Sequence, residues 1–319
     1  FLIFFTQPRT NAVINNRIYE KRRAAVARAL KAAGGGIALL PTAPEVARNR
    51  DSGFPYRHDS YFYYLTGFTE PNACLVIAAN GHSTLFCQPK DLEREIWDGI
   101  RLGPQAAPAA LGVNMALSAA ELNKEIPKLL ENQTTVWFPF ATHEGLTAQV
   151  DGWLTQVRSR VRMGVSCPSS QQDLCTLLDE MRLVKDTHEQ DTMRRAARIV
   201  ERMHAVIRDK AEVGMPKNEL IADIYHASVF GAEGHWGDYP AIVPMAPSGM
   251  DATAPHLTWD DAPLRARIVV ARERQWRRQA CLNAALPASR LEERLEISAG
   301  AGRLLASGRG PLALSLRSR

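Results

Sequence analysis

One histidine stands in a stretch whose composition could support chemistry. His256 lies among prolines, glycines and acids between Asp238 and Ala271. The pKa of a neutral imidazole lies near operating pH, so the side chain can serve as a general acid or base, or bind a substrate in a pocket. A solvent-facing loop histidine is the alternative interpretation of His256.

A second dense stretch runs from Asp51 to Phe68. Charged side chains stand at its start, and tyrosines and phenylalanines follow. Aromatic residues favour strands, so the pattern predicts a loop that leads into an aromatic core strand and bends at Gly67. The composition of this stretch alone does not indicate which reaction the protein could catalyse.

Alternating strand and helix signals surround the second stretch. The apolar spacing predicts helices, and a run of three glycines ends the first of them. Apolar runs predict strands, two of which flank Asn80-Gly81 as a hairpin. The expected helices are 17–33, 91–100, 118–132 and 144–160, and the expected strands are 37–40, 73–79, 83–87 and 134–140. This interleaving predicts an α/β (α+β) domain with a mixed sheet up to about residue 165.

The following part of the chain opens with helical patterns. Two helices are expected within 171–210, with a break near Lys185 and an N-cap at Asp186. Another helix is expected at 217–230, ending at Gly231, and strands are expected only near Ala241.

The charge of the chain is concentrated at one end. Residues 265–319 contain 12 Arg, no Lys and 4 Glu, whereas the whole chain has a formal net charge of +5. A basic tail of this kind implies weak attraction to polyanions at most, so no nucleic-acid partner is expected. The Arg/Ala/Leu bias predicts a frameshift or assembly error in this tail, with a diverged basic tail or a nucleic-acid arm as the alternatives.

Composition also bears on the compartment. Five cysteines without C-x-x-C spacing favour a reducing cytoplasm over a disulfide framework or a zinc site. No apolar run approaches the length of a membrane span, so no membrane partner is expected.

Three motifs together resemble the aminopeptidase P (Xaa-Pro aminopeptidase) family of the pita-bread metallopeptidase and creatinase superfamily. They are the stretches 51–68, 95–103 and 179–185, which occur in the family's order and spacing. The resemblance implies a creatinase-like amino-terminal domain at 17–165, a truncated pita-bread catalytic domain at 170–264 and a basic tail of doubtful origin at 265–319.

The resemblance also implies a homo-oligomer. In the family, the amino-terminal domain builds the oligomer and brings residues close to a neighbouring subunit's active site. Asp51 and Trp97 stand at the matching positions and are candidate substrate-binding residues, with purely local packing as the alternative.

The family's two Mn²⁺ ions are held by two aspartates, a histidine and two glutamates, ligands that suit this metal. The first aspartate should follow an apolar strand soon after His256. The sequence there is Ile268-Val269-Val270-Ala271-Arg272-Glu273, and no histidine follows His256. The chain therefore lacks the expected metal ligands, and we predict that it is inactive as a metallopeptidase.

Residues 237–261 resemble the creatinase and ectoine-hydrolase-like branch more closely. Enzymes of the creatinase type work without metal and use the histidine matching His256 as catalytic acid or base. Asp238, Tyr239 and Trp259 are candidate substrate-binding residues beside it. The predicted function is hydrolysis of an amino-terminal residue that precedes proline in a peptide substrate. The alternatives are a metal-free amidohydrolase using His256 and a non-catalytic oligomerisation module.

Overall fold

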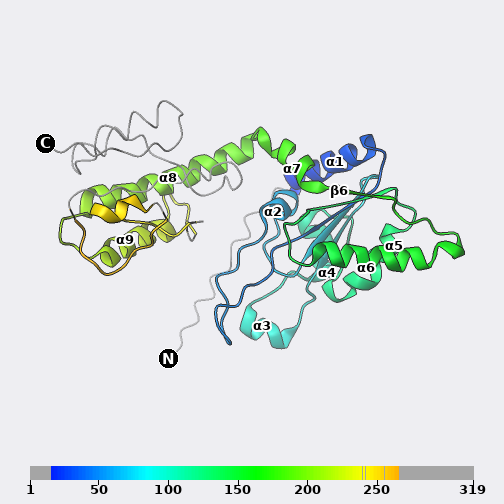
Figure 1. Cartoon of the computed structure of the whole chain (residues 1–319), viewed down its shortest axis with the longest axis horizontal. Coiled ribbons are helices and arrows are strands. Elements are labelled where there is room, and N and C mark those ends of the chain that lie inside the picture. Colours follow the sequence, from blue (N-terminus) through cyan, green and yellow to red (C-terminus); the bar gives the residue numbers. More distant parts are fainter. Residues whose placement is uncertain (1–15, 239, 241, 255, 266–319) are drawn as a thin grey trace. The chain divides into compact units, whose positions relative to one another are not determined.

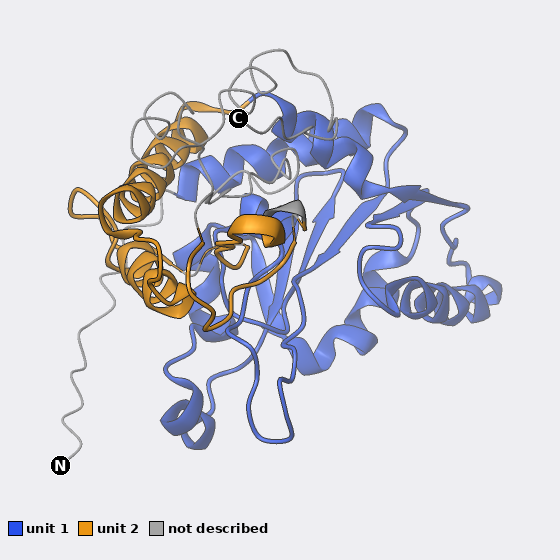
Figure 2. Ribbon diagram, turned by 60° about the vertical axis from the view of Figure 1, so that its left-hand side comes forward, with its two compact units in different colours: residues 1–184 blue, residues 185–319 orange. Residues whose placement is uncertain are grey.

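The computed structural model describes residues 16–265 except 239, 241 and 255. The chain divides into two compact units, residues 1–184 and residues 185–319 (Figure 2), and each is described by itself below. The division falls after Val184, within the motif 179–185. The predicted domain limits of 17–165, 170–264 and 265–319 stay a prediction.

Unit 1 contains a mixed sheet (Figure 1). It has six strands in the order β4-β3-β2-β1-β5-β6. β1 is antiparallel to β2 and β2 to β3, whereas β3–β4, β1–β5 and β5–β6 are parallel. The strands are β1 (Ile37–Pro41), β2 (Cys74–Ala78), β3 (Ser83–Cys87), β4 (Met115–Ser118), β5 (Thr135–Phe138) and β6 (Ser170–Asp173). The predicted α/β class with a mixed sheet is confirmed.

Helices cover both faces of this sheet. The helices of unit 1 are α1 (Asn16–Ala32), α2 (Ser60–Thr66), α3 (Leu92–Asp98), α4 (Gly103–Leu111), α5 (Leu122–Leu130), α6 (Leu146–Ser159) and α7 (Leu174–Leu183). Of these, α3 has no buried residue and does not cover the sheet. Because successive side chains of a strand point to opposite faces, Ala38 and Leu40 of β1 pack with α1, α2, α4 and α7. Ile37 and Leu39 pack with α5 and α6 on the other face. A strand buried on both sides explains the uninterrupted apolar run that the sequence shows.

The hairpin predicted at Asn80-Gly81 is confirmed. The Ala78 N–H donates to His82 O at 2.9 Å, and the Gly81 N–H donates to Ala78 O at 2.9 Å. Gly81 has a φ of 94°, which a residue without a Cβ adopts at little cost. The hairpin therefore sets the register of β2 against β3.

The strand expected in the aromatic stretch 51–68 is wrong, because its residues Ser60–Thr66 form the helix α2. The Asp59 side chain accepts a hydrogen bond from the Phe62 N–H at 2.8 Å and caps the first turn. Gly67 ends the helix in the left-handed conformation, with φ at 67°. A cap at each end outweighs the strand preference of the aromatic residues between them.

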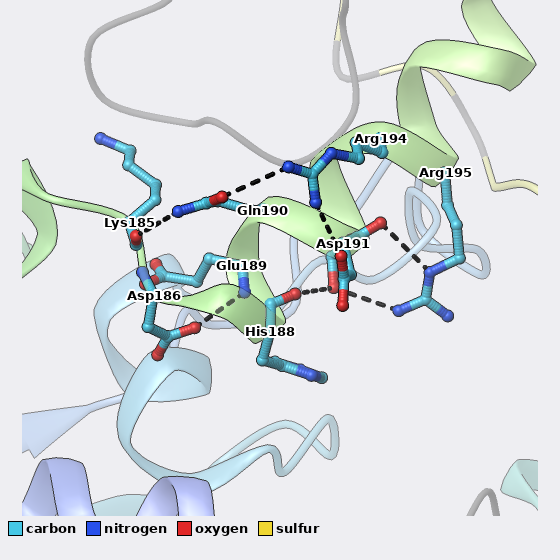
Figure 3. A network of polar contacts seen from close by, with 9 residues as sticks. Lys185, Asp186, His188, Glu189, Gln190, Asp191, Arg194 and Arg195 are labelled. Carbon is cyan, nitrogen blue, oxygen red and sulfur yellow. Dashed lines mark hydrogen bonds and ion pairs between the residues drawn. The ribbon is translucent and has the colours of Figure 1, made fainter.

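Unit 2 is built on two helices, α8 (Thr187–Lys210) and α9 (Lys217–Phe230). The predicted break near Lys185 and the N-cap at Asp186 are confirmed. Asp186 Oδ1 accepts from the Glu189 N–H at 2.8 Å, and Glu189 Oε2 accepts from the Asp186 N–H at 3.1 Å (Figure 3). This capping box satisfies two otherwise unpaired backbone donors where α8 begins.

The predicted end of α9 at Gly231 is also confirmed, since the Gly231 N–H donates to Ala227 O at 3.1 Å. The strands expected near Ala241 are not found among the described residues 242–265, which form loops and the 3-10 helix η3 (Gly249–Thr253). Ala241 itself lies outside the described residues. Ala246 and Leu264 of this segment pack into a small core with α8 and α9, so side-chain burial fixes the segment without a sheet. None of the helices in the described residues is long and apolar enough to cross a membrane.

Candidate functional site

His256 is an exposed residue of the segment 251–260 of unit 2, which begins within the 3-10 helix η3. The segment returns to the core at Leu264, which is 1% exposed. The Leu264 N–H donates to Met215 O at 2.7 Å, and the Gly214 N–H donates to Leu264 O at 2.8 Å. The backbone leaving the segment is therefore anchored just before α9, while the imidazole stays accessible to a ligand or to water.

A lysine that sequence reasoning missed contacts this segment from α9. Lys217 Nζ lies 3.1 Å from Asp251 Oδ2 and 2.9 Å from Asp260 Oδ1. The hydrogen bond to Asp260 raises the pKa of Lys217, and the same bond lowers the pKa of the Asp260 carboxyl. Lys217 and Asp260 are therefore both charged at neutral pH. A lysine at the first position of a helix, where a cation opposes the helix dipole, is the signal that could have revealed it.

Asp238 is placed by a close return of the chain onto the end of α9. The Gly237 N–H donates to Val229 O at 3.1 Å, and Ser228 Oγ donates to Asp238 O at 2.8 Å. A Cβ at Gly237 would clash with the Ser228 carbonyl oxygen, so only glycine fits this approach. The Asp238 residue is exposed. Tyr239 lies outside the described residues.

Trp259 is on the same segment as His256 and is 40% exposed. It directly precedes Asp260, whose carboxylate is paired with Lys217. The structure therefore places His256 and Trp259 together on one anchored segment. Their roles as catalytic and substrate-binding residues stay predictions.

The other two candidates belong to unit 1. The Asp51 N–H donates to Asn49 Oδ1 at 2.9 Å, inside an exposed turn that Ala47 and Gly53 close as an isolated bridge. Trp97 is 87% exposed on α3, a helix with no buried residue. Local packing therefore does not account for Trp97, and its substrate-binding role, like that of Asp51, stays a prediction.

The described residues do not fit a two-metal centre. Among them no group of three or more His, Cys, Asp or Glu side chains lies close enough to hold a metal ion. Two acids of the His256 segment, Asp251 and Asp260, already bind the Lys217 ammonium. We therefore derive no chemical step through a metal from these residues.

Comparison with known proteins first defines the class. Residues 19–137, within unit 1, match the family model of the aminopeptidase P N-terminal domain. Aminopeptidase P from Escherichia coli in complex with substrate superimposes with a TM-score of 0.73 at 34% identity, covering 79% of this chain and 57% of that one. A zinc-substituted form of the same enzyme in complex with product gives a TM-score of 0.73 at 33% identity, covering 80% of this chain and 57% of that one.

The particular relatives follow from the sequence matches. The Xaa-Pro aminopeptidase of Escherichia coli (strain K12) is 33% identical over 256 residues, which make up 79% of this chain and 57% of the relative. The ectoine hydrolase of Halomonas elongata is 39% identical over 130 residues, 39% of this chain and 33% of that protein. The chain is thus a relative of the Xaa-Pro aminopeptidases with an aminopeptidase P N-terminal domain, and both suspected resemblances are confirmed. It spans a little over half of the length of the aminopeptidase.

Proposed function

We propose that the protein is by family an Xaa-Pro aminopeptidase-type metallopeptidase, the class of enzyme that removes the amino-terminal residue before a proline. The observation that carries this proposal is the similarity to Escherichia coli Xaa-Pro aminopeptidase over 79% of the chain. In an enzyme of this class a bound metal would activate the water that attacks the scissile amide, and Mn²⁺ is the metal we expect there. The described residues of this chain offer no group of ligands that would hold it. The substrate is a peptide with proline at its second position.

We propose further that these 319 residues do not perform the reaction by themselves. The expected aspartate is missing from 268–273, and no histidine follows His256. These positions, apart from His256, lie outside the described residues, so this part rests on the sequence. His256 and Trp259 would supply one wall of a substrate pocket.

The test combines metal content with peptide hydrolysis. The purified chain is loaded with Mn²⁺, dialysed and analysed for bound metal, then assayed on an Xaa-Pro peptide and on a matched Xaa-Ala peptide. We expect substoichiometric metal and no release of the first residue. Stoichiometric Mn²⁺ together with release from the Xaa-Pro peptide alone would show that the chain is active.

The match to an ectoine hydrolase favours a second candidate, a metal-free amidohydrolase. In that case the exposed imidazole of His256 acts as the general acid or base. An amidase activity that persists in a chelator and disappears in His256→Ala would support this candidate. Inhibition by the chelator, or full activity of His256→Ala, would exclude it.

The surface of α3 favours a third candidate, a homo-oligomerisation module. Leu92 and Ile96 lie four positions apart, so they share one side of α3, and both are exposed together with Trp97. We expect light scattering of the full chain to report an oligomer that Ile96→Ser dissociates. Val161→Ser, at another exposed apolar residue of unit 1, is the control and should leave the mass unchanged. A monomeric wild-type chain would exclude this role.

The cytoplasm is the compartment we propose. The four cysteines in the described part of the chain, Cys74, Cys87, Cys167 and Cys175, are all free thiols. Free thiols are typical of proteins in a reducing compartment.

A further inference from the structure

A buried ammonium lies beneath the segment that carries His256. Lys217 is the first residue of α9 and is only 2% exposed, a rare environment for a lysine. Its backbone N–H donates to Ala262 O at 3.1 Å, so the main chain of this residue also contacts the segment. Burial of an ammonium is tolerated when carboxylates pair with it.

The two carboxylates that pair with Lys217 stand on either side of His256 in the sequence. Asp251 lies in η3, before the histidine, and its Oδ2 is 3.1 Å from Nζ. Asp260 lies after the histidine, and its Oδ1 is 2.9 Å from Nζ. One cation therefore joins the two ends of residues 251–260.

We propose that Lys217 is a positioning residue for His256. It holds Asp251 and Asp260 together at the base of the segment, and the placement of the imidazole, which lies between them in the sequence, depends on this contact. The proposal rests on the assignment of His256 to the proposed site, but it concerns the placement of the imidazole and not the reaction. Lys217 is not a catalytic residue, because it contacts the segment and no reacting group.

The charge of Lys217, and not only its carbon chain, is needed for this role. A cation in the first turn of a helix faces the positive end of the helix dipole, so the site is unfavourable for lysine unless anions lie nearby. Without the ammonium, Asp251 and Asp260 would repel each other. An uncharged side chain of similar length fills the same space but cannot hold the two carboxylates.

The test uses the full chain with two readouts that need no hydrolysis. Hydrogen–deuterium exchange reports opening of residues 251–260, and mass spectrometry reports the rate at which diethylpyrocarbonate modifies His256. The exposed His82 of unit 1 serves as the internal reference. The variants are Lys217→Met, which keeps the stem and removes the charge, and Lys217→Arg, which restores the charge.

Lys210→Met is the matched control in the same unit. Lys210 Nζ lies 2.8 Å from Asp223 Oδ2, but the lysine side chain of this pair is 53% exposed. An exposed ion pair contributes little to stability, so we expect the Lys210→Met control to behave as the wild type. We expect Lys217→Met to speed hydrogen–deuterium exchange in residues 251–260 by about tenfold. The same variant should change the rate at which diethylpyrocarbonate modifies His256 several-fold. Lys217→Arg should return both readouts to within about twofold of the wild type.

Two results would overturn the proposal. One is a Lys217→Met variant that matches Lys210→Met in both readouts, and the other is a Lys217→Arg variant as altered as Lys217→Met. If Lys217→Met does not fold, Asp260→Asn replaces it, since this exposed carboxylate can be neutralised while Lys217 keeps Asp251. Faster exchange in residues 251–260 and an altered rate of His256 modification in Asp260→Asn support the proposal. Exchange and modification rates equal to those of the wild type refute it. Because neither readout depends on turnover, a chain without peptidase activity leaves the test intact.

Discussion

A single arginine connects the ends of two helices in unit 1. Arg23 Nη1 donates to Leu65 O at 2.8 Å, and Nη2 donates to Leu111 O at 3.0 Å. These carbonyls lie at the carboxyl-terminal ends of α2 and α4, where acceptors lack partners within the helix and a cation is favourable. Burial lowers the pKa of Arg23 to about 10. The guanidinium therefore remains charged at neutral pH.

We expect Arg23→Met to destabilise unit 1 by about 3 kcal/mol, because it leaves buried carbonyls without their charged donor. Urea unfolding followed by circular dichroism measures the change. Arg28→Met, at an exposed position of the same helix, is the control and should lie within about 0.5 kcal/mol of the wild type. Equal stability of the two variants would show that the Arg23 contacts contribute nothing net.

The cysteine thiols give a second prediction for individual residues. Burial raises the pKa of Cys74 and of Cys87 to about 12, and that of Cys175 to about 11. The thiolate is the nucleophile, so all three should react slowly with iodoacetamide at pH 8 in the native chain. We expect their labelling to become fast only in urea, as peptide mass spectrometry would report. Rapid native labelling of Cys74 would contradict this account.

At the scale of elements, α2 depends on the glycine that ends it. Gly67 has a φ of 67°, and a Cβ there would lie 2.6 Å from Cε2 of the Tyr19 ring. Alanine at this position would have to hold a left-handed backbone and displace an aromatic ring. The helix end and its packing against α1 therefore require the same residue.

We expect Gly67→Ala to lower the free energy of unfolding by about 1–2 kcal/mol. Gly152→Ala should act in the opposite direction, since Gly152 lies within α6 with open space around it. In that helix alanine should stabilise by about 0.5–1 kcal/mol. Chemical denaturation of both variants checks the pair, and a stabilising Gly67→Ala would contradict the strained cap.

Elements were predicted well where their signals are local. Asp186 and Gly231 mark the start of α8 and the end of α9, and both predictions are confirmed, because a cap forms with residues three or four positions away. The caps of α2, at Asp59 and Gly67, carry the same signals. The tyrosines and phenylalanines between them favour a strand, so the sequence predicts a strand with a bend at Gly67 in place of a capped helix.

At the scale of the whole chain, the two units have separate cores. The sheet of unit 1 is buried on both faces by its own helices, whereas α8, α9 and Leu264 form the core of unit 2. We expect calorimetry to resolve two transitions. Arg23→Met should lower the midpoint of the unit 1 transition. Leu264→Ala should lower the free energy of unfolding of unit 2 by about 2–4 kcal/mol, because of the cavity that it leaves. A single transition that both variants shift equally would contradict independent units.

The sequence alone determined the features that rest on neighbouring residues. The apolar run Ile37 to Leu40 fixes a strand buried on both faces, and Asn80-Gly81 fixes the hairpin, because dihedral preference and side-chain alternation act within a few positions. Only the tertiary structure decided how His256 is held. Lys217 and Asp251 are 34 positions apart, and their attraction depends on burial and on the distance between them, which no local pattern specifies.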